Sequence, residues 1–456
     1  MSRSTMLSRD DCVNPNPDNT LTDRLNTALN SSGPGYVLSL CPNTEYIILA
    51  PIHFAFPGQE MSTLGYPTGE ARAVLTVQGP VRNGTGHTTA VDGTCANCDG
   101  VRLRNIQVNG TRKGASPTTG GANIEMGGSN ANQLIEYVHS FDPRSWSCLH
   151  VAEGSLSCTN VTVQNNDIGP CGSDMSKQWA DGISFSCRNG VVRNNLLNNP
   201  TDGGIVLFGS PGTLVENNTI WVENRTMLGG INMVDHEPFN GDYTGVIVRD
   251  NLIMGGFATN PPTTEDGYLG YNKYNVMIKI GIAIGPRTWF GDEFGANVSM
   301  SGTVENNELS GAFGYGIAIS SARNFTIQKN FLTRNTAFIG SPGPKCNPKD
   351  TTPSPMPFLV DQSLVNGSSL QVDFQPVADG NALTCIIPPQ SGDQWPYSNG
   401  TTTPPTGNSG QLPVGSRALL IVGVILGVLA AMGATWFVVK WRRRKGTRSP
   451  SSSHLK

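Results

Sequence analysis

The sequence predicts an all-β body made of stacked parallel coils, with a short helix before it and one membrane-spanning helix after it. Three observations support this fold class. Only 14% of the 456 residues are charged and 54 are glycine, which is typical of a folded, turn-rich β protein and not of a disordered chain. A short motif recurs through the middle of the chain, and an uncharged apolar segment lies near its end.

The recurring motif reads as an aliphatic residue, two variable residues, an asparagine, one variable residue and a final Ile or Leu. Its asparagines are Asn166, Asn195, Asn218, Asn251, Asn307 and Asn330. A second short strand alternates with this motif and follows Gly182, Gly204, Gly230, Gly281 and Gly316, with its apolar side chains on one face. We expect both strands to stack coil on coil around one aliphatic core.

The asparagines should form a ladder at a turn that every coil repeats. Asparagine tolerates the left-handed backbone conformation, and its amide can hydrogen-bond to the coils above and below. The interval of 56 residues between Asn251 and Asn307 fits two coils, one of them degenerate or carrying an insertion.

These repeats resemble the right-handed β-helix family that includes pectate lyases, polygalacturonases and mannuronan C5-epimerases, over about residues 75 to 340. The resemblance implies a right-handed single-stranded parallel β-helix of the pectin-lyase-like superfamily, with a short N-terminal capping helix plus one C-terminal transmembrane helix. It is specific for the fold and unspecific for the activity. A β-propeller or a β-sandwich is the alternative, but the Gly-His/Trp-Asp and Cys-Trp-Cys patterns of those folds are missing.

The chain divides into six expected segments. Thr22–Asn30 reads as an amphipathic helix, which by the resemblance covers the open N-terminal end of the core. The expected boundaries are 1–45 for the N-terminal segment with this capping helix, 46–340 for the parallel β-helix, 341–390 for a C-terminal wrap, 391–416 for a Pro/Ser/Thr-rich stalk, 418–439 for the transmembrane helix and 440–456 for a basic cytoplasmic tail.

The apolar segment Ala418–Val439 carries no charge over 22 residues. At about 1.5 Å per residue it can cross a hydrocarbon core of roughly 30 Å. The basic cluster that follows should stay on the cytoplasmic side, which places the body outside the cell or in a lumen. Gly423 and Gly427 form one GxxxG motif, which could pack a homodimer.

Ten N-x-S/T sequons and ten cysteines agree with an extracellular or luminal body. The N-terminal residues, in contrast, contain no apolar stretch, so a signal peptide is missing from this start. We favour a truncated start over insertion by the C-terminal anchor, which would leave the body in the cytosol.

The composition also restricts the partners. Before the basic tail the chain carries 24 basic against 34 acidic residues, which argues against nucleic acid. Cys95 and Cys98 form the only CxxC motif, with no second ligand pair nearby, so a zinc site is not expected. No cofactor or metal is predicted, and calcium lacks a compact motif of oxygen ligands. By the resemblance, the expected partner is a polysaccharide or another glycan.

Two carboxylates are the first candidates for catalysis. Asp181 and Asp202 are 21 residues apart, whereas the equivalent glycines, Gly182 and Gly204, are 22 apart. The acids should therefore lie on adjacent coils, one position out of step, with their backbones roughly 6 Å apart. Such a pair fits an acid and a base of a glycosidase. Asp-Gly is also ordinary turn chemistry, and this alternative stays open.

A second candidate follows from the resemblance to mannuronan epimerases. Phe141-Asp142-Pro143-Arg144 is similar to their Phe-Asp-Pro-His segment, with Arg144 in place of the histidine. The resemblance implies a catalytic Asp142, and Arg144 and Lys177 have the chemistry to bind a uronate carboxylate. Polygalacturonases are a weaker match, because their Gly-His-Gly motif is absent and only Ile278-Lys279 remains of their Arg-Ile-Lys motif.

Further residues are candidates for substrate binding. The aromatic side chains most relevant to a binding site are Trp146, Trp179, Trp221 and Trp289. Trp179 lies two residues before Asp181 and could stack on a sugar ring, although these large aromatics could equally fill loops against the wall of the coil. His236 belongs to the run Asp235-His236-Glu237, which could bind a metal or move a proton, or could be a solvated loop.

Two functions remain open from the sequence. One is an enzyme acting on cell-wall or extracellular polysaccharide, a hydrolase with Asp181 and Asp202 or, as a further alternative, a uronate-polymer lyase or C5-epimerase. The other is a glycosylated, non-catalytic surface scaffold or adhesion protein. The outward positions of the core strands carry no charge, which lowers the expectation for a polyuronate substrate.

Overall fold

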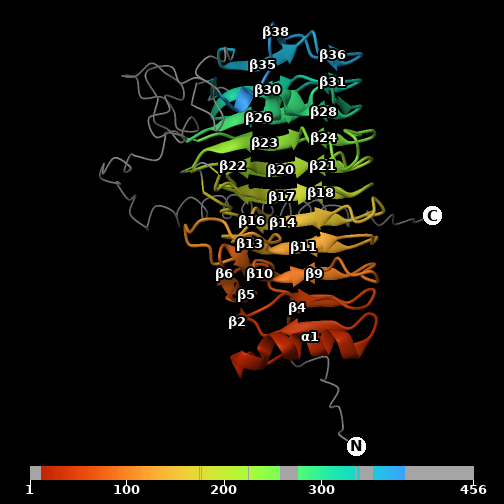
Figure 1. The fold of residues 1–456 in the computed structure, drawn as a ribbon, viewed down its shortest axis with the longest axis vertical. Coiled ribbons are helices and arrows are strands. Elements are labelled where there is room, and N and C mark those ends of the chain that lie inside the picture. The colour runs from red at the N-terminus through yellow and green to blue at the C-terminus, as the bar shows by residue number, and fades with distance from the viewer. Residues whose placement is uncertain are drawn as a thin grey trace, which may run out of the picture. The chain divides into compact units, whose positions relative to one another are not determined.

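The computed structural model describes residues 12–173, 175, 177–223, 225–256, 276–333, 336–338 and 353–385. Over these residues the chain forms three long parallel sheets of 11, 10 and 12 strands. Strands from the three sheets follow one another along the chain, and each pairs with its counterpart on the next coil. Figure 1 shows the resulting stack of coils, from β4 near the N-terminal end to β35 near the other end.

The bounds of the strands are as follows. The first sheet contains β1 Val37–Leu40, β4 Glu60–Thr63, β9 Arg102–Arg104, β12 Leu134–Glu136, β15 Thr162–Gln164, β18 Val191–Arg193, β21 Leu214–Glu216, β24 Ile247–Arg249, β28 Thr303–Glu305, β32 Thr326–Gln328 and β37 Ser369–Leu370. The second sheet contains β2 Glu45–Ile48, β5 Ala73–Val77, β10 Ile106–Asn109, β13 His139–Phe141, β16 Asp167–Ile168, β19 Leu196–Asn198, β22 Thr219–Trp221, β25 Leu252–Met254, β29 Glu308–Ser310 and β33 Phe331–Leu332. The third sheet contains β3 Ile52–His53, β8 Val91–Asp92, β11 Ile124–Gly127, β14 Ser147–Ala152, β17 Asp181–Phe185, β20 Gly203–Leu207, β23 Met227–Met233, β26 Ile278–Ile284, β30 Ala312–Ile319, β34 Ala337–Phe338, β35 Met356–Asp361 and β38 Gln375–Val377.

Shorter elements complete the fold. A small parallel sheet contains β27 Ser299–Met300, β31 Ala322–Arg323 and β36 Val365–Asn366, and a hairpin contains β6 Val81–Arg82 and β7 Thr85–Gly86. The helices are η1 Asp18–Thr20, α1 Leu21–Ser32, α2 Pro286–Phe290, η3 Gly291–Phe294 and η4 Leu383–Cys385.

The core follows from the alternating pattern of the third sheet. Ile183, Ile205, Ile231, Ile282 and Ile317 occupy one register position on five successive coils and are fully buried. Stacking one aliphatic residue above another buries a continuous column, which no single coil could do alone. The strands expected after the five glycines are therefore confirmed.

The asparagine ladder is also confirmed. Each asparagine donates from Nδ2 to Oδ1 of the next at 2.9 Å, in the order Asn166, Asn195, Asn218, Asn251, Asn307 and Asn330. All six are at least 96% buried, so the bonds replace water that the amides have lost.

Two details of the repeat differ from expectation. The left-handed residue is the one before each ladder asparagine, with φ between 54° and 57° at Asn165, Asn194, Asn217, Asp250, Asn306 and Lys329. The ladder side chain can thus point inward while its predecessor makes the turn. The 56 residues between Asn251 and Asn307 form one coil with an insertion, because β24 pairs directly with β28 and the two amides bond to each other.

The helix α1 covers the N-terminal end of the core, as expected. Leu21, Leu25 and Leu29 lie on one face and are fully buried against the first coil. In Figure 1 the helix lies across the red end of the stack. It shields strand edges that would otherwise be open to pairing with another chain.

Strand pairing extends beyond the expected limits of the β-helix at both ends. β1 lies within the segment assigned to residues 1–45 and pairs with β4. At the other end β35 pairs with β30 and β38 pairs with β35, past residue 340. Part of the expected C-terminal wrap therefore continues the third sheet.

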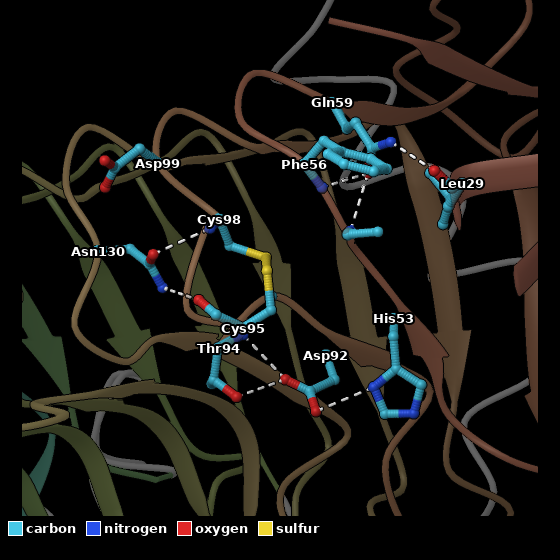
Figure 2. The surroundings of a disulfide bond; sticks show 12 residues. Leu29, His53, Phe56, Gln59, Asp92, Thr94, Cys95, Cys98, Asp99 and Asn130 are labelled. Atoms are coloured by element: carbon cyan, nitrogen blue, oxygen red, sulfur yellow. Dashed lines mark hydrogen bonds and ion pairs between the residues drawn. A yellow bond between two sulfur atoms is a disulfide. The ribbon is translucent and has the colours of Figure 1, made fainter. Parts of the chain in front are cut away.

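Four disulfides join cysteines of the described residues: Cys12–Cys41, Cys95–Cys98, Cys148–Cys171 and Cys158–Cys187. Figure 2 shows the Cys95–Cys98 bridge, where the Asn130 amide accepts from the Cys98 N–H and donates to the Cys95 carbonyl. The CxxC motif is thus a disulfide that closes a tight turn.

The expected stalk at 391–416, the transmembrane helix at 418–439 with Gly423 and Gly427, and the basic tail at 440–456 lie outside the described residues. Within the described residues, no helix combines the length and apolar character needed to cross a membrane.

Candidate functional site

Asp181 and Asp202 enter adjacent strands of the third sheet. Asp181 is the first residue of β17, and Asp202 directly precedes β20. The backbone N–H of Asp202 donates to the Ala180 carbonyl at 3.1 Å, although the strands themselves pair Ile183 with Ile205. The two aspartates therefore lie on neighbouring coils one residue out of step, as the spacing of the glycines predicts.

The carboxyl group of Asp181 is held on both oxygens. Its Oδ1 accepts a hydrogen bond from the Gly203 N–H at 2.8 Å, and its Oδ2 lies 2.8 Å from Oγ of Ser184. The residue is only 7% exposed. Burial raises the pKa of Asp181 well above its ordinary value, and the negative charges of Asp202 and Asp235 raise it further.

Two more carboxyl groups belong to the same electrostatic cluster. Burial raises the pKa of Asp202 to about 6. Burial, followed by repulsion from Asp202, raises the pKa of Asp235 to about 7. Like charges that share a poorly hydrated site cannot all ionise at once, so protonated and ionised carboxyls coexist near neutral pH.

A cleft of about 410 Å³ opens beside Asp202. Its lining includes the apolar side chains of Trp179, Leu228, Trp289 and Phe290. The lining is completed by Gly291, Asp292, Glu293, Asn381, Ala382 and Thr384. The cleft thus places one carboxyl of raised pKa among three aromatic side chains.

Two chain segments that are distant in sequence meet at the cleft. Arg287 of α2 forms ion pairs with Asp292 and with Asp379, the latter at 3.0 Å. The Ala382 N–H donates to the Arg287 carbonyl at 2.9 Å, and the Asn381 amide donates to Asp292 at 3.3 Å. These contacts fix residues 379–382 against the helical insertion and set the shape of the cleft.

The coil fold and one stretch of the sequence agree on the fold class. Residues 147–260 match the family model described as the right handed beta helix region. This chain is a right-handed parallel β-helix protein. No curated protein matches the sequence of this chain.

Several solved structures are similar to this β-helix at low identity. The catalytic domain of a GH87 alpha-1,3-glucanase is 12% identical with a TM-score of 0.41, over 78% of this chain and 64% of the glucanase chain. DFA-IIIase from Arthrobacter chlorophenolicus A6 is 13% identical with a TM-score of 0.42, and the match covers 78% of this chain and 90% of the DFA-IIIase chain. PfbA, a surface adhesin of Streptococcus pneumoniae, is 13% identical with a TM-score of 0.38, and the match covers 71% of this chain and 89% of the PfbA chain. The β-helix thus spans less than two thirds of that glucanase chain, and similarities at this level assign no activity.

The epimerase-like residues lie away from the cleft. Asp142 adopts a left-handed conformation with φ 51°, and its Oδ2 accepts the Lys113 N–H at 2.9 Å. The guanidinium of Arg144 donates to Thr111 and to the carbonyls of Gly79 and His87. Both side chains therefore stabilise turns, and neither lines the cleft beside Asp202.

The other predicted binding residues have different positions. Trp179 lines the cleft as expected, whereas Lys177 is exposed on the same loop, outside the lining. His236 lies on the loop after β23, where its carbonyl accepts the Gly241 N–H at 2.6 Å. The binding roles of Lys177 and His236 stay predictions.

Sequence reasoning named Asp235 only as a member of the run Asp235-His236-Glu237 and assigned no role to Phe290 or Asn381. That run was the signal for Asp235, because three ionisable residues begin two positions after the end of the core strand β23. Asn381, in contrast, reaches the cleft only through the return of the chain after β38, which no local pattern indicates.

The lining of the cleft is acidic. It contains Asp202, Asp292 and Glu293, and no Lys, Arg or His among its described residues. Elsewhere in the described ranges, no group of three or more His, Cys, Asp or Glu side chains is arranged to hold a metal ion. The prediction that the protein needs no cofactor, and the open question of calcium, stay untested.

Proposed function

We propose that this β-helix binds a glycan chain in the cleft beside Asp202 and hydrolyses a glycosidic bond there. The observation that carries the proposal is the position of Asp202, a carboxyl with a pKa of about 6, in a cleft whose lining also includes Trp179 and Trp289. Pockets that combine aromatic side chains with a few polar groups are the usual binding sites for small organic ligands.

The aromatic side chains supply binding area. Sugar rings present C–H groups that pack flat against an aromatic face, and a buried aromatic side chain contributes a large apolar surface. Trp179, Trp289 and Phe290 supply aromatic side chains to the lining of the cleft. This supports a chain of sugar rings as the ligand.

The carboxyl cluster supplies the chemistry. Hydrolysis needs one protonated carboxyl, which gives its proton to the glycosidic oxygen, and one carboxylate, which activates water or attacks the anomeric carbon. The pKa of Asp202, about 6, is lower than that of Asp235, about 7, so we assign Asp202 as the carboxylate. Asp181 and Asp235, whose pKa values are also raised, are the neighbours that keep a proton at higher pH.

The charge of the lining favours an uncharged glycan. A polyuronate would bring one carboxylate per sugar into a cleft that already holds Asp202, Asp292 and Glu293, with no cation in its described lining. Like charges repel most where water is excluded. A uronate lyase or epimerase would instead need positive groups at the substrate carboxylate.

We also propose that the body works in an oxidising, extracellular or luminal compartment. Four disulfides are formed, and sequon asparagines such as Asn83, Asn160, Asn217 and Asn366 are exposed where an oligosaccharide can be attached. The membrane anchor at 418–439 and a homodimer through Gly423 and Gly427 belong to this proposal as expectations from the sequence.

A glycan panel tests the proposed function. The full chain is incubated with neutral, amino-sugar and uronate polysaccharides, and both binding and products are measured. New reducing ends from a neutral glycan are the expected result, whereas unsaturated products from a uronate polymer would indicate a lyase. Tight binding without any product across the panel would overturn hydrolysis and favour an adhesion protein.

A further inference from the structure

An aromatic ring and an imidazole contact each other at the strand β14, outside the cleft beside Asp202. The rings of Trp146 and His150 lie 4.9 Å apart between their centroids and meet edge to face at 65°. Trp146 directly precedes β14, and 36% of its surface is exposed. Since edge-to-face contacts between rings are favourable, the imidazole restrains an indole that is still open to a ligand.

A carboxylate on the neighbouring strand fixes this imidazole. Oε2 of Glu125 on β11 lies 2.6 Å from Nδ1 of His150, and Oε1 of Glu125 accepts the Ala122 N–H at 2.6 Å. When Nδ1 donates to Glu125, a neutral imidazole has its acceptor at Nε2. Within the described part of the chain no hydrogen bond occupies this Nε2, and the atom is not enclosed. A hydroxyl group from outside can therefore donate to it.

The pair of Glu125 and His150 occupies the open part of a column that runs along the third sheet. Glu125, His150, Ser184, Val206 and Asn232 hold one register position on successive coils. Ser184, Val206 and Asn232 are each at most 6% exposed, whereas 17% of the side-chain surface of Glu125 and of His150 is accessible. This column is therefore covered at β17, β20 and β23 and is open to a ligand at β11 and β14.

The open part lies next to the acid cluster. The Trp146 carbonyl accepts the Asp181 N–H at 2.8 Å, and the Ala180 carbonyl accepts the Asp202 N–H at 3.1 Å. Trp146, Ala180 and Asp202 thus follow one another on three coils. Because neighbouring parallel strands are about 4.8 Å apart, the backbones of Trp146 and Asp202 are separated by roughly 10 Å. Trp179, which lines the cleft, belongs to the coil between them.

We propose that Trp146 and His150 form a second glycan contact, which holds a sugar chain on the N-terminal side of the cleft. One sugar ring packs on the indole of Trp146, and one of its hydroxyls donates to Nε2 of His150. Glu125 is a positioning residue that acts through the imidazole. The inference rests on the proposed function, because the same sugar chain also occupies the cleft beside Asp202. The preferred substrate is then a chain long enough to reach both places, and not a disaccharide.

Binding of oligosaccharides of increasing length to the full chain tests the second contact. The probes are neutral oligosaccharides, from disaccharide to octasaccharide, prepared from each neutral polysaccharide of the panel. The wild type should bind the longest probes about tenfold more tightly than the disaccharides, and Trp146→Ala should remove most of this gain. Trp146→Phe, which keeps an aromatic ring, should retain most of it. Disaccharide binding should be the same in all three proteins.

The variant Glu125→Gln tests the role of the carboxylate. Because the Ala122 N–H holds Oε1, the amide nitrogen of glutamine takes the place of Oε2 and donates to Nδ1 of His150. The imidazole proton then moves to Nε2, which can no longer accept from a sugar hydroxyl. Glu125→Gln should therefore weaken binding of the long probes about fivefold, as His150→Ala should, and leave the disaccharides unaffected.

Asp92→Asn is the matched control for Glu125→Gln. Oδ2 of Asp92 lies 3.2 Å from Nδ1 of His53, and Asp92 pairs with Glu125 one coil further from the cleft. Figure 2 shows this second acid–imidazole pair. Among the described residues no aromatic ring contacts His53, so Asp92→Asn should bind probes of every length like the wild type.

Long probes that bind no more tightly than disaccharides, or not at all, would overturn the inference. So would a Trp146→Ala variant that binds every probe like the wild type, or one that loses disaccharide binding to the same extent. Long probes that depend on Trp146 but are never cleaved would defeat the proposed hydrolysis and leave the second contact standing. Cleavage of a polymer by Trp146→Ala at the wild-type rate and KM would remove the second contact and leave hydrolysis in the cleft intact.

Discussion

The backbone N–H of Gly203 donates a hydrogen bond of 2.8 Å to Oδ1 of Asp181 on the neighbouring coil. This bond ties the turn that contains Asp202 to the carboxyl group of Asp181. The one-residue offset between the two aspartates is thus fixed by main-chain geometry, and the acid cluster does not depend on flexible side chains to assemble.

Stability should depend on pH through the acid cluster. The pKa values of Asp202 and Asp235, about 6 and about 7, lie above the ordinary value of 3.8. Between that value and pH 7 the folded state binds more protons than the unfolded state, so the free energy of unfolding falls as pH rises and levels off above pH 7.

Urea titrations of the wild type and Asp202→Asn at pH 4, 5, 6 and 7 measure this effect. We expect the advantage of the wild type over the variant to shrink with rising pH, because the variant lacks one of the groups that lose their proton. The exposed turn residue Asp250 supplies the control variant, Asp250→Asn. A wild-type advantage that grows with pH would contradict the raised pKa of Asp202.

The asparagine ladder should carry much of the stability of the coil stack. Asn218 donates to the Val192 carbonyl and to Asn251, and it accepts from the N–H and the amide of Asn195. Asn218→Ala leaves buried partners without hydrogen bonds, each costing about 1–3 kcal/mol. Chemical denaturation should therefore show a loss of roughly 3 kcal/mol or more.

Asn19 provides a matched control for the ladder, since it is exposed and lies in η1. Its replacement by alanine should change stability by less than about 0.5 kcal/mol. Equal effects at Asn19 and Asn218 would show that the ladder contributes nothing specific.

The tryptophans of the cleft should control glycan binding. Removing one stacking face costs about 1–1.5 kcal/mol, which is close to a tenfold change in affinity. Trp289→Ala and Trp179→Ala should each raise KM or Kd by about that factor. Trp221, on β22 of the second sheet, lies outside the cleft and is the control. Equal weakening by Trp221→Ala would argue for a binding site elsewhere.

The acidic lining should disfavour anionic glycans. Replacing Asp292 and Glu293 by asparagine and glutamine removes two charges from the cleft. Binding of uronate oligomers should then improve at low ionic strength, while binding of neutral oligomers should change little. Calorimetric titration of both ligand classes compares them. Tighter uronate binding by the wild type than by the double variant would contradict the charge argument.

Much of the fold could be predicted from the sequence because each coil repeats the same local rules. The aliphatic column at Ile183 and Ile205, and the ladder at Asn195 and Asn218, follow from periodic residues whose partners lie one repeat away. The left-handed position was misplaced by one residue, since both asparagines of an Asn-Asn pair suit a turn and only the structure shows which one points inward.

The site could be predicted only where it follows the repeat. The offset of Asp181 and Asp202 depends on coil spacing and is confirmed. The rest of the cleft lining depends on the helical insertion with Trp289 and on Asn381, which follows β38. Such contacts join residues without a periodic relationship. Asp142, which a short similarity in sequence marked as catalytic, accepts a hydrogen bond from the Lys113 N–H, and its catalytic role stays a prediction.

The central claim is that Asp202 is the carboxylate that cleaves a glycan. It is tested most directly by the rate at which the full chain releases reducing ends from the glycan that the panel identifies. Asp202→Asn should reduce this rate by about 10²-fold or more, while Asp250→Asn should leave it at the wild-type level. Equal rates for Asp202→Asn and the wild type would contradict the account and leave the cleft without a catalytic role.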